Sequence, residues 1–364
     1  MIPSVITETD LGRHDSTLPF EENSRSMNIK MIARMAGVSV ATVSKIMNNY
    51  KDVSEETKQR VLKIMEETGY KPSSSAKTLA TKKSNLIGVV FAGELNSDLS
   101  HPFFVSVLDA FKKQIGLLGY DLIFFSNEKF FEEKEDYWAR CRHFQVEGCI
   151  IIAGDQVEPS IHRLDRSDIP CIGIDIRLTG ENSAFLMSDN AKISARVVEH
   201  FYMTGYRDIG FIGIERDSEI TKTREVAFKE SMEMFGLNVN PDWFVYSKDF
   251  EEESGYRAMK ELIARGTLPR ALFAVTDLLA FGALRAAREH GIRIPEQVAL
   301  VGCDDLTACQ YTEPALTSIK QDKEKMGKLA AMILYDMINK QMEPKSVIVE
   351  AELVIRKSCG AKMG

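Results

Sequence analysis

The sequence predicts a small all-α helix-turn-helix head followed by an α/β core of two lobes, each built on a parallel, Rossmann-like sheet. Three observations lead to this fold class. Helical spacing and capping residues are concentrated between residues 28 and 69, and positive charge is concentrated on the same stretch. From residue 85 onward, short apolar runs alternate with longer amphipathic stretches. A chain of 364 residues is long enough for two or three domains.

Three short helices are predicted in the head. Asn28, Ser39 and Ser54 can each cap a helix, and Gly37 and Gly69 can end the first and the third. Apolar residues recur at helical spacing and are expected to face one another: Ile29, Ile32, Ala33 and Ala36, then Val43, Ile46 and Met47, then Val61, Ile64 and Met65. Spacing alone leaves open a DNA-reading unit or a helical hairpin on the surface of a larger core.

The distribution of charge favours DNA binding. Residues 27–84 contain 11 Lys and Arg against 5 Asp and Glu, a net charge of +6, whereas the whole chain carries −7. Residues 85–364 therefore carry a net charge of −10 and residues 1–26 carry −3. A basic charge confined to one small module is typical of phosphate contact, while an acidic remainder discourages non-specific adhesion.

Two polar segments flank the head. Residues 1–26 lack any hydrophobic period, and we expect a disordered extension. The basic stretch 72–84 is expected to form a hinge between the head, residues 27–71, and the core. Its middle could form one or two helical turns with Ala76 and Leu79 on one side. Such a short helix is unstable alone, so both a flexible linker and a segment that orders on DNA stay open.

The core repeats one plan twice. Strands are expected at 86–92, 121–125, 149–153 and 171–174, and again at 209–214, 244–247, 271–275 and 298–302. Helices are expected around 103–118, 130–144 and 157–166, and then near 189–204, 220–235, 252–265 and 277–290. Glycines should end helices at Gly119, Gly205, Gly236 and Gly291. Paired parallel α/β units usually bind small molecules at the carboxyl ends of their strands.

Other classes of protein find little support in the sequence. The six cysteines show no C-x-x-C spacing, so we expect free buried thiols, no metal site and no cofactor. No stretch is long and apolar enough for a membrane span, and the N-terminus lacks the order of a signal peptide. We therefore expect a cytoplasmic protein with no membrane contact. Catalytic residues are not expected, because no phosphate-binding, metalloprotease or serine-hydrolase motif is present.

A basic helix-turn-helix, a hinge and two α/β lobes, in that order, resemble the lactose-repressor/galactose-repressor (LacI/GalR) family of bacterial transcription factors. The resemblance extends from residue 28 to about residue 357 and rests on these motifs: Ala36-Gly37-Val38-Ser39, Ala41-Thr42-Val43-Ser44-Lys45, Asn48, Gly69-Tyr70, Pro72, Ala76 and Leu79. Weaker support comes from Pro102-Phe103-Phe104, Thr276-Asp277, Gly302-Cys303-Asp304-Asp305 and Leu316-Thr317-Ser318-Ile319.

The family implies a periplasmic-binding-protein-like core with interleaved lobes. The N-terminal lobe would comprise residues 85–186 and 319–345, the C-terminal lobe residues 187–318 and 346–357, and residues 358–364 would form a tail. In the head, the residues implied to contact bases are Val40, Ala41 and Lys45. Those implied to contact phosphates are Ser39, Thr42, Ser44 and Asn48. In the hinge, Ala76 and Leu79 would lie in the minor groove, where Leu79 would wedge into a base step.

An effector pocket between the lobes is also implied, lined by Phe103, Asp175, Arg224, Phe250, Thr276 and Asp304. Carboxylates and a guanidinium suit polyhydroxylated ligands, and an aromatic ring can cover the apolar face of a sugar. Thr276-Asp277 stands where many relatives have Asn-Asp, and the connection over residues 93–100 is longer than usual. The effector therefore cannot be taken from any single relative.

The resulting prediction is a ligand-responsive, sequence-specific regulator, a repressor of carbohydrate uptake or catabolism genes. It would bind near-palindromic operators in double-stranded DNA as a homodimer or tetramer, with a sugar or sugar phosphate between its lobes. Induction and corepression stay equally open. The alternatives are a two-lobed sugar-binding protein without a regulatory role, and a sugar-modifying enzyme that uses Asp304 and Asp305.

Overall fold

A computed structural model describes residues 27–47, 50, 52–70, 83–92, 99, 101–126, 136–153, 157, 159–215 and 219–361. The expectations for the extension 1–26, for Asn48, for most of the hinge with Ala76 and Leu79, and for residues 362–364 lie outside these ranges. The chain divides into two compact units, Met1–Ser84 and Asn85–Gly364. The division falls at the predicted junction between hinge and core.

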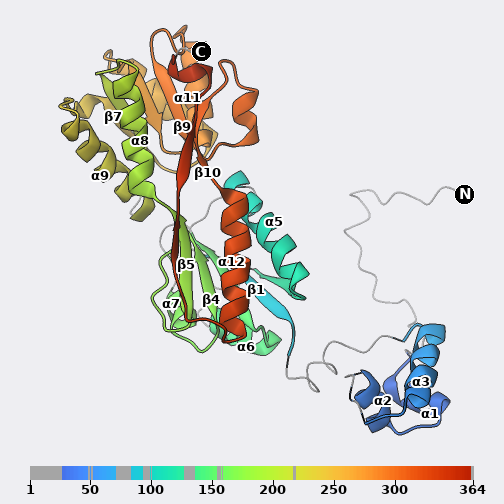
Figure 1. Ribbon diagram of the computed structural model, residues 1–364. Coiled ribbons are helices and arrows are strands. Elements are labelled where there is room, and N and C mark those ends of the chain that lie inside the picture. Colours follow the sequence, from blue (N-terminus) through green and yellow to red (C-terminus); the bar gives the residue numbers. More distant parts are fainter. Residues whose placement is uncertain are drawn as a thin grey trace, which may run out of the picture. The chain divides into compact units, whose positions relative to one another are not determined.

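The head contains the three predicted helices, α1 (Ile29–Ala36), α2 (Val40–Met47) and α3 (Glu55–Thr68) (Figure 1). The side chain of Asn28 accepts the N–H of Met31 at 3.1 Å, and that of Ser54 accepts the N–H of Thr57 at 3.3 Å. Gly37 and Gly69 adopt left-handed φ angles of 65° and 63° at the ends of α1 and α3. The predicted caps are therefore confirmed.

Six buried side chains form the core of the head: Ile32, Ala33, Ala36, Val43, Ile46 and Val61. The other apolar residues predicted to face inward pack around them but are only partly buried: Ile29, Met47, Ile64 and Met65. Arg60 in α3 also donates from Nε to the carbonyl of Ala36 at 3.2 Å, which links α3 to the end of α1. Because the core is so small, each of its fully buried side chains matters to the stability of the head.

The first lobe is a wholly parallel sheet in the order β11-β5-β4-β3-β1-β2. Its strands are β1 (Leu86–Ala92), β2 (Asp121–Phe125), β3 (Gly148–Ala153), β4 (Cys171–Ile174), β5 (Ser183–Ser188) and β11 (Val347–Val349). Helices α5 (Pro102–Leu117) and α12 (Lys323–Ile338) pack together on one face (Figure 1). Helices α6 (Tyr137–Phe144) and α7 (Pro159–Asp165) contribute to the apolar cluster on the other.

The second lobe is a sheet in the order β12-β10-β9-β8-β6-β7. Its strands are β6 (Ile209–Ile214), β7 (Phe244–Ser247), β8 (Ala271–Ala274), β9 (Ala299–Cys303), β10 (Thr317–Gln321) and β12 (Ala351–Val354). The helices are α8 (Asn190–Met203), α9 (Glu219–Met234), α10 (Glu252–Ala264) and α11 (Asp277–Glu289). One correction concerns β12, which pairs antiparallel with β10, so this sheet is not wholly parallel.

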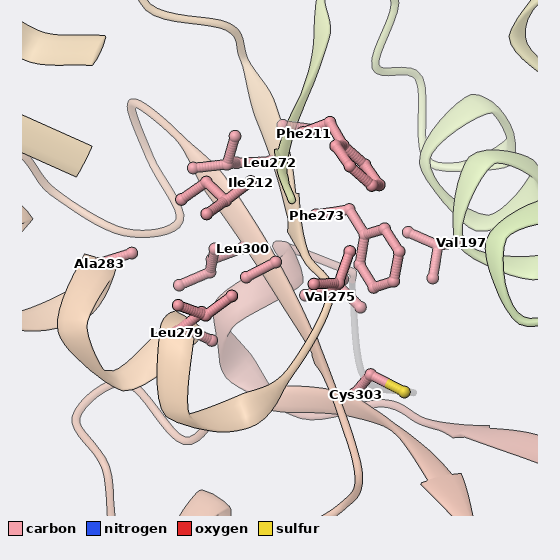
Figure 2. Close-up of a cluster of buried hydrophobic side chains, with 14 of the residues drawn as sticks. Val197, Phe211, Ile212, Leu272, Phe273, Val275, Leu279, Ala283, Leu300 and Cys303 are labelled. Atoms are coloured by element: carbon pink, nitrogen blue, oxygen red, sulfur yellow. The ribbon is translucent and has the colours of Figure 1, made fainter. Parts of the chain in front are cut away.

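The packing of the second lobe explains why the sequences of its strands are continuous apolar runs. Phe211, Phe273 and Val197 lie together beside the sheet, and Leu279 and Ala283 of α11 lie close to Leu272 and Leu300 of the strands (Figure 2). Helices therefore cover the central strands, whose side chains are buried in both directions. The carboxyl ends of β8 and β9 are thereby fixed in a rigid frame.

Several strands and one helix of the core were missed by the sequence analysis. The sequence did not predict β5, β10, β11, β12 or α12. The chain crosses between the two sheets near Asp189, Asp322 and Glu350, because β5 and β11 belong to the first sheet and β10 and β12 to the second. The predicted boundaries at 318/319 and 345/346 were therefore placed too early, by three and about four residues. The first boundary, at 186/187, falls within β5, two residues before its end.

The predicted helix-ending glycines and free cysteines are present in the structure. The four helix-ending glycines Gly119, Gly205, Gly236 and Gly291 have φ angles of 88°, 94°, 66° and 70°, as predicted. All six cysteines are free and buried. Within the described ranges, no group of three or more His, Cys, Asp or Glu side chains is placed to hold a metal ion. No helix found in those ranges combines the length and apolar character needed to span a membrane.

Candidate DNA-reading and effector-binding sites

The outer face of α2 carries the residues predicted to read bases. Val40 is 40% exposed, and Ala41 and Lys45 are exposed as well. Ser39, predicted to contact phosphate, uses its hydroxyl as the helix cap and accepts the N–H of Thr42 at 3.0 Å. Its hydroxyl also lies 2.9 Å from that of Thr42. The hydroxyls of Ser39 and Thr42 therefore lie within hydrogen-bond distance of each other at the start of α2. Ser44, on the same helix, is half-buried.

Lys45 has a partner that the sequence did not suggest. Its ammonium forms an ion pair with the carboxylate of Asp52, in the turn before α3, and both side chains are about half exposed. The hydrogen bond from Lys45 lowers the pKa of Asp52 below its usual value. An exposed pair of this kind is weak, so DNA phosphates or bases could compete with Asp52 for the lysine.

The six residues predicted at the effector pocket occupy defined positions in the core: Phe103, Asp175, Arg224, Phe250, Thr276 and Asp304. Asp175, Thr276 and Asp304 follow β4, β8 and β9, so they lie at the carboxyl ends of parallel strands. Asp175 and Asp304 adopt left-handed φ angles of 56° and 120°. Residues other than glycine rarely adopt these angles, and such backbone strain is often found at functional sites.

Arg224 of α9 lies at the centre of this group. It is only 4% exposed, and its guanidinium donates from Nε to Oδ1 of Asn190 at 2.8 Å and from Nη1 to the carbonyl of Val275 at 2.6 Å. Its positive charge also acts on the carboxylates of Asp175 and Asp304, favouring their ionised forms. The charge of Arg224 therefore acts on two carboxylates, one from each lobe.

Burial works against the ionised forms of both carboxylates. It raises the pKa of Asp175 to about 7, with Arg224 opposing and the charge of Asp304 adding to the rise. Burial likewise raises the pKa of Asp304, against the effects of His101, Arg224 and Lys323. One oxygen of Asp304 accepts the side-chain amide of Gln321 at 2.6 Å. Near neutral pH, Asp175 is therefore partly protonated, whereas an exposed aspartate would be ionised.

Several buried polar atoms in this group have no hydrogen-bond partner among the described residues. They are His101 Nδ1, Asp175 Oδ1, Asp304 Oδ2 and Gln321 Oε1. Leaving such an atom unsatisfied costs about 1–3 kcal/mol, and most buried polar atoms in proteins are paired. This concentration of unpaired atoms, rather than any single residue, makes the group a candidate binding site. We refer to His101, Asp175, Arg224, Phe250, Asp304 and Gln321 as the interlobe cluster.

His101 is a member of the cluster that sequence reasoning missed. It is only 6% exposed, and its ring lies 5.1 Å from that of Phe104 and 6.5 Å from that of Phe250, measured between centroids. Burial lowers the pKa of His101, although Asp304 and Glu251 oppose this shift. Its position directly before Pro102-Phe103-Phe104, a motif already singled out, was the available signal.

Two of the predicted pocket residues have structural partners. Phe103 is 2% exposed and packs edge-on against Phe104 at a centroid distance of 5.2 Å. The hydroxyl of Thr276 accepts the N–H of Leu279 at 3.4 Å and so caps α11. The structure therefore gives both a packing or capping role, whereas Asp175 and Asp304 each keep an unpaired oxygen.

Asp277, the next residue along, explains how Asp304 is held in place. It is fully buried and accepts hydrogen bonds from the N–H of Leu306 at 2.8 Å, from Cys309 Sγ at 3.0 Å and from Ser318 Oγ at 2.6 Å. These bonds fix the loop that follows β9. Asp277 is therefore a positioning residue for Asp304, and the sequence did not distinguish it from its neighbours.

Asp304 and Asp305, the two aspartates considered for a sugar-modifying enzyme, have different partners. Asp305 forms an ion pair with Arg356 at 2.6 Å, and its N–H donates to Ser318 Oγ at 3.0 Å. Asp304 instead bonds to Gln321. Two carboxylates that act together as acid and base must face the same substrate bond, and this pair is divided between different neighbours.

A hollow of about 680 Å³ lies close to the interlobe cluster. It is lined by residues of α5, β10 and α12 and by their neighbours, among them Asp109, Lys113, Lys320, Gln321 and Lys323. Gln321 is its only lining residue that also belongs to the cluster. Most of the buried unpaired atoms belong to the cluster and not to the lining of this hollow, so the cluster is the stronger candidate for an effector site.

Comparison with known proteins covers both parts of the chain. A family described as bacterial regulatory proteins, lacI family, matches residues 28–73, and a periplasmic binding protein-like domain matches residues 198–359. The HTH-type transcriptional repressor PurR of Pasteurella multocida is 30% identical over 337 residues, covering 92% of this chain and 99% of that protein. The repressor PurR of Shigella sonnei is 32% identical over 333 residues, covering 91% and 96%.

Solved structures agree with these relatives. A complex of the transcriptional regulator CelR with cellobiose has a TM-score of 0.68 at 26% identity and covers 91% of this chain and 99% of that one. The lac repressor dimer bound to operator and the anti-inducer ONPF has a TM-score of 0.79 at 24% identity, covering 93% and 100%, which is a likeness of fold. The chain therefore belongs to the LacI/GalR family and is a DNA-binding transcriptional repressor of that family, not an enzyme.

Proposed function

We propose that this repressor binds near-palindromic operators as a homodimer and controls genes of carbohydrate uptake or catabolism, in the cytoplasm and in response to a sugar held at the interlobe cluster. Binding of the effector would change the relative orientation of the lobes and so the ability of the paired heads to occupy both half-sites. The observation that carries this proposal is the convergence of Asp175, Arg224 and Asp304 from both lobes, with unpaired oxygens on both carboxylates.

On the DNA side, support comes from the exposed face of α2. Val40 and Ala41 can make only apolar contacts, which suit thymine methyl groups, while Lys45 can donate to guanine O6 and N7. Ser39, Thr42 and Ser44 lie on the same helix or at its start and are proposed phosphate contacts. The solved lac repressor is a dimer on its operator, and a two-fold symmetric dimer requires a two-fold symmetric site.

On the effector side, support comes from chemistry and from two structural relatives. CelR was solved with cellobiose, and a LacI-family regulator from Enterococcus faecium was solved with ribose. The rings of His101 and Phe250 lie 6.5 Å apart between centroids, and the charge of Asp304 acts on His101, so these rings can cover the apolar face of a ring-shaped ligand. The same rings could stack on a purine base, which makes purines the most informative rival ligands.

The function is tested by measuring operator binding with candidate ligands present. The full chain is titrated against fragments of its own upstream promoter in a gel-shift assay, alone and with cellobiose, ribose, glucose or adenine. We expect a specific shift that one of the sugars strengthens or weakens by about 5- to 150-fold, the usual range of allosteric coupling. A response to adenine alone would replace the sugar with a purine, and the absence of any specific shift would overturn the proposed operator binding.

Replacing Lys45 with Ala tests the base-reading role within α2. We expect Lys45→Ala to weaken operator binding by about 1–3 kcal/mol while non-specific binding changes much less, because a base contact contributes only at the correct sequence. The matched control is Asp52→Ala, which removes the ion-pair partner and leaves the lysine in place. Competition binding on operator and random DNA measures both variants. An equal loss on the two DNAs would make Lys45 a phosphate contact.

A further inference from the structure

The unpaired atoms of the interlobe cluster are almost all hydrogen-bond acceptors. Asp175 Oδ1, Asp304 Oδ2 and Gln321 Oε1 are buried oxygens without a donor among the described residues, and His101 Nδ1 is the fourth atom of the set. An amide oxygen and an ionised carboxylate oxygen can only accept, whereas the imidazole nitrogen and a protonated carboxyl group can also donate. A ligand that satisfies the cluster must therefore bring several N–H or O–H donors.

Arg224 in the cluster and Lys323 beside it already donate to the protein. Arg224 bonds to Asn190 and to the carbonyl of Val275. The ammonium of Lys323, which acts on Asp304, donates to the backbone carbonyls of Asp304 and Asp305. Both cations therefore stabilise the local fold and the carboxylates, and displacing the bonds that they now make would cost free energy.

The charges of the cluster also disfavour a phosphorylated ligand. The charge of Asp304 raises the pKa of Asp175, and the guanidinium of Arg224 lowers the pKa of both carboxyl groups. A phosphate monoester would add close to two negative charges beside this pair in a buried site, where Coulomb repulsion is strong. An ammonium group would meet two carboxylates instead.

We propose that the effector is an unphosphorylated, donor-rich molecule, either uncharged or carrying an amine, and that the interlobe cluster rejects phosphate esters of the same molecule. This inference rests on the proposed function, because it concerns the ligand of the same site. Hydroxyl or ammonium donors would satisfy Asp175, Asp304 and Gln321 together. Selection between a sugar and its phosphate would therefore come from the two carboxylates, not from the aromatic rings.

Matched sets of ligands test the proposal on the full chain. Glucose, glucosamine and glucose 6-phosphate, together with ribose and ribose 5-phosphate, are compared by isothermal titration calorimetry at neutral pH. For any sugar that binds, we expect the phosphate ester to bind at least about tenfold more weakly than its parent, and glucosamine to bind no more weakly than glucose. An ester that binds more tightly than its parent would overturn the inference and leave the proposed effector site intact.

A substitution tests whether Asp175 is responsible for the preference for a sugar over its phosphate ester. Asp175→Asn keeps the shape of the side chain and removes its charge, so we expect the preference for the parent over the ester to fall by about tenfold or more. Glu181→Gln removes the same charge from an exposed position in the same lobe and should leave the preference unchanged. If Asp175→Asn and Glu181→Gln prefer the parent sugar over its ester to the same degree, the proposed role of Asp175 is wrong. If no member of any set binds, both the proposed sugar effector and this inference fail.

Discussion

Replacing Ile32 with Asp is expected to unfold the head and to lower operator affinity by at least about 100-fold, while the two lobes keep their stability. Ile32 is fully buried among the five other core residues of the head. A buried, unpaired carboxylate costs several kcal/mol, and so small a core has only a few kcal/mol of stability to lose. The head and the core form separate compact units, so the loss should stay in the head.

The matched control for this variant is Met35→Asp. Met35 lies in the same helix but is 54% exposed, so it adds the same charge without burying it. Gel-shift titration measures operator binding, and thermal unfolding followed by circular dichroism measures the two units of the full chain. If Met35→Asp loses as much affinity as Ile32→Asp, the added negative charge near DNA, rather than unfolding of the head, would explain the result.

Local signals predicted the head and most of the core well. Caps, glycine turns and apolar spacing depend on a few neighbouring residues, which is why the predicted caps of α1 and α3 and the predicted bounds of β1 agree with the structure. The missed elements are short or depend on partners far along the chain. β11, for example, pairs with β5, more than 150 residues earlier, and contains only three residues. Its pairing has no local sequence signal.

The sequence likewise predicted some features of the candidate site and missed others. Asp175 and Asp304 could be placed at strand ends from the sequence, and the family resemblance supplied Arg224. The sequence could not show that Thr276 caps α11, that Asp277 holds the loop after β9, or that Lys45 pairs with Asp52. Each of these depends on which of several nearby polar atoms lies within hydrogen-bond distance, and that is decided by tertiary packing. His101 was overlooked for the same reason.

Replacing Arg224 with Ala is expected to destabilise the core by about 3–5 kcal/mol and to abolish the effector response. The substitution leaves Asn190 Oδ1 and the carbonyl of Val275 without their donor, in a part of the lobe that is closed to solvent. It also removes the cation that opposes the buried charges of Asp175 and Asp304. The pKa of Asp175 should therefore rise further above its ordinary value, because burial and repulsion by Asp304 would act without opposition.

Arg285→Ala provides the comparison, since Arg285 is an arginine of the same lobe with exposed ion pairs to Glu252 and Glu253. Such pairs contribute about 0–1 kcal/mol, so the control should stay close to wild type. Urea unfolding of the full chain gives the two free energies, and calorimetry with a ligand identified on the wild-type chain gives the response. A loss below about 1 kcal/mol in Arg224→Ala would mean that water replaces the guanidinium at the cluster. The unpaired oxygens of Asp175 and Asp304 would then be accessible to water, and the central argument for a closed, donor-requiring effector site would fail.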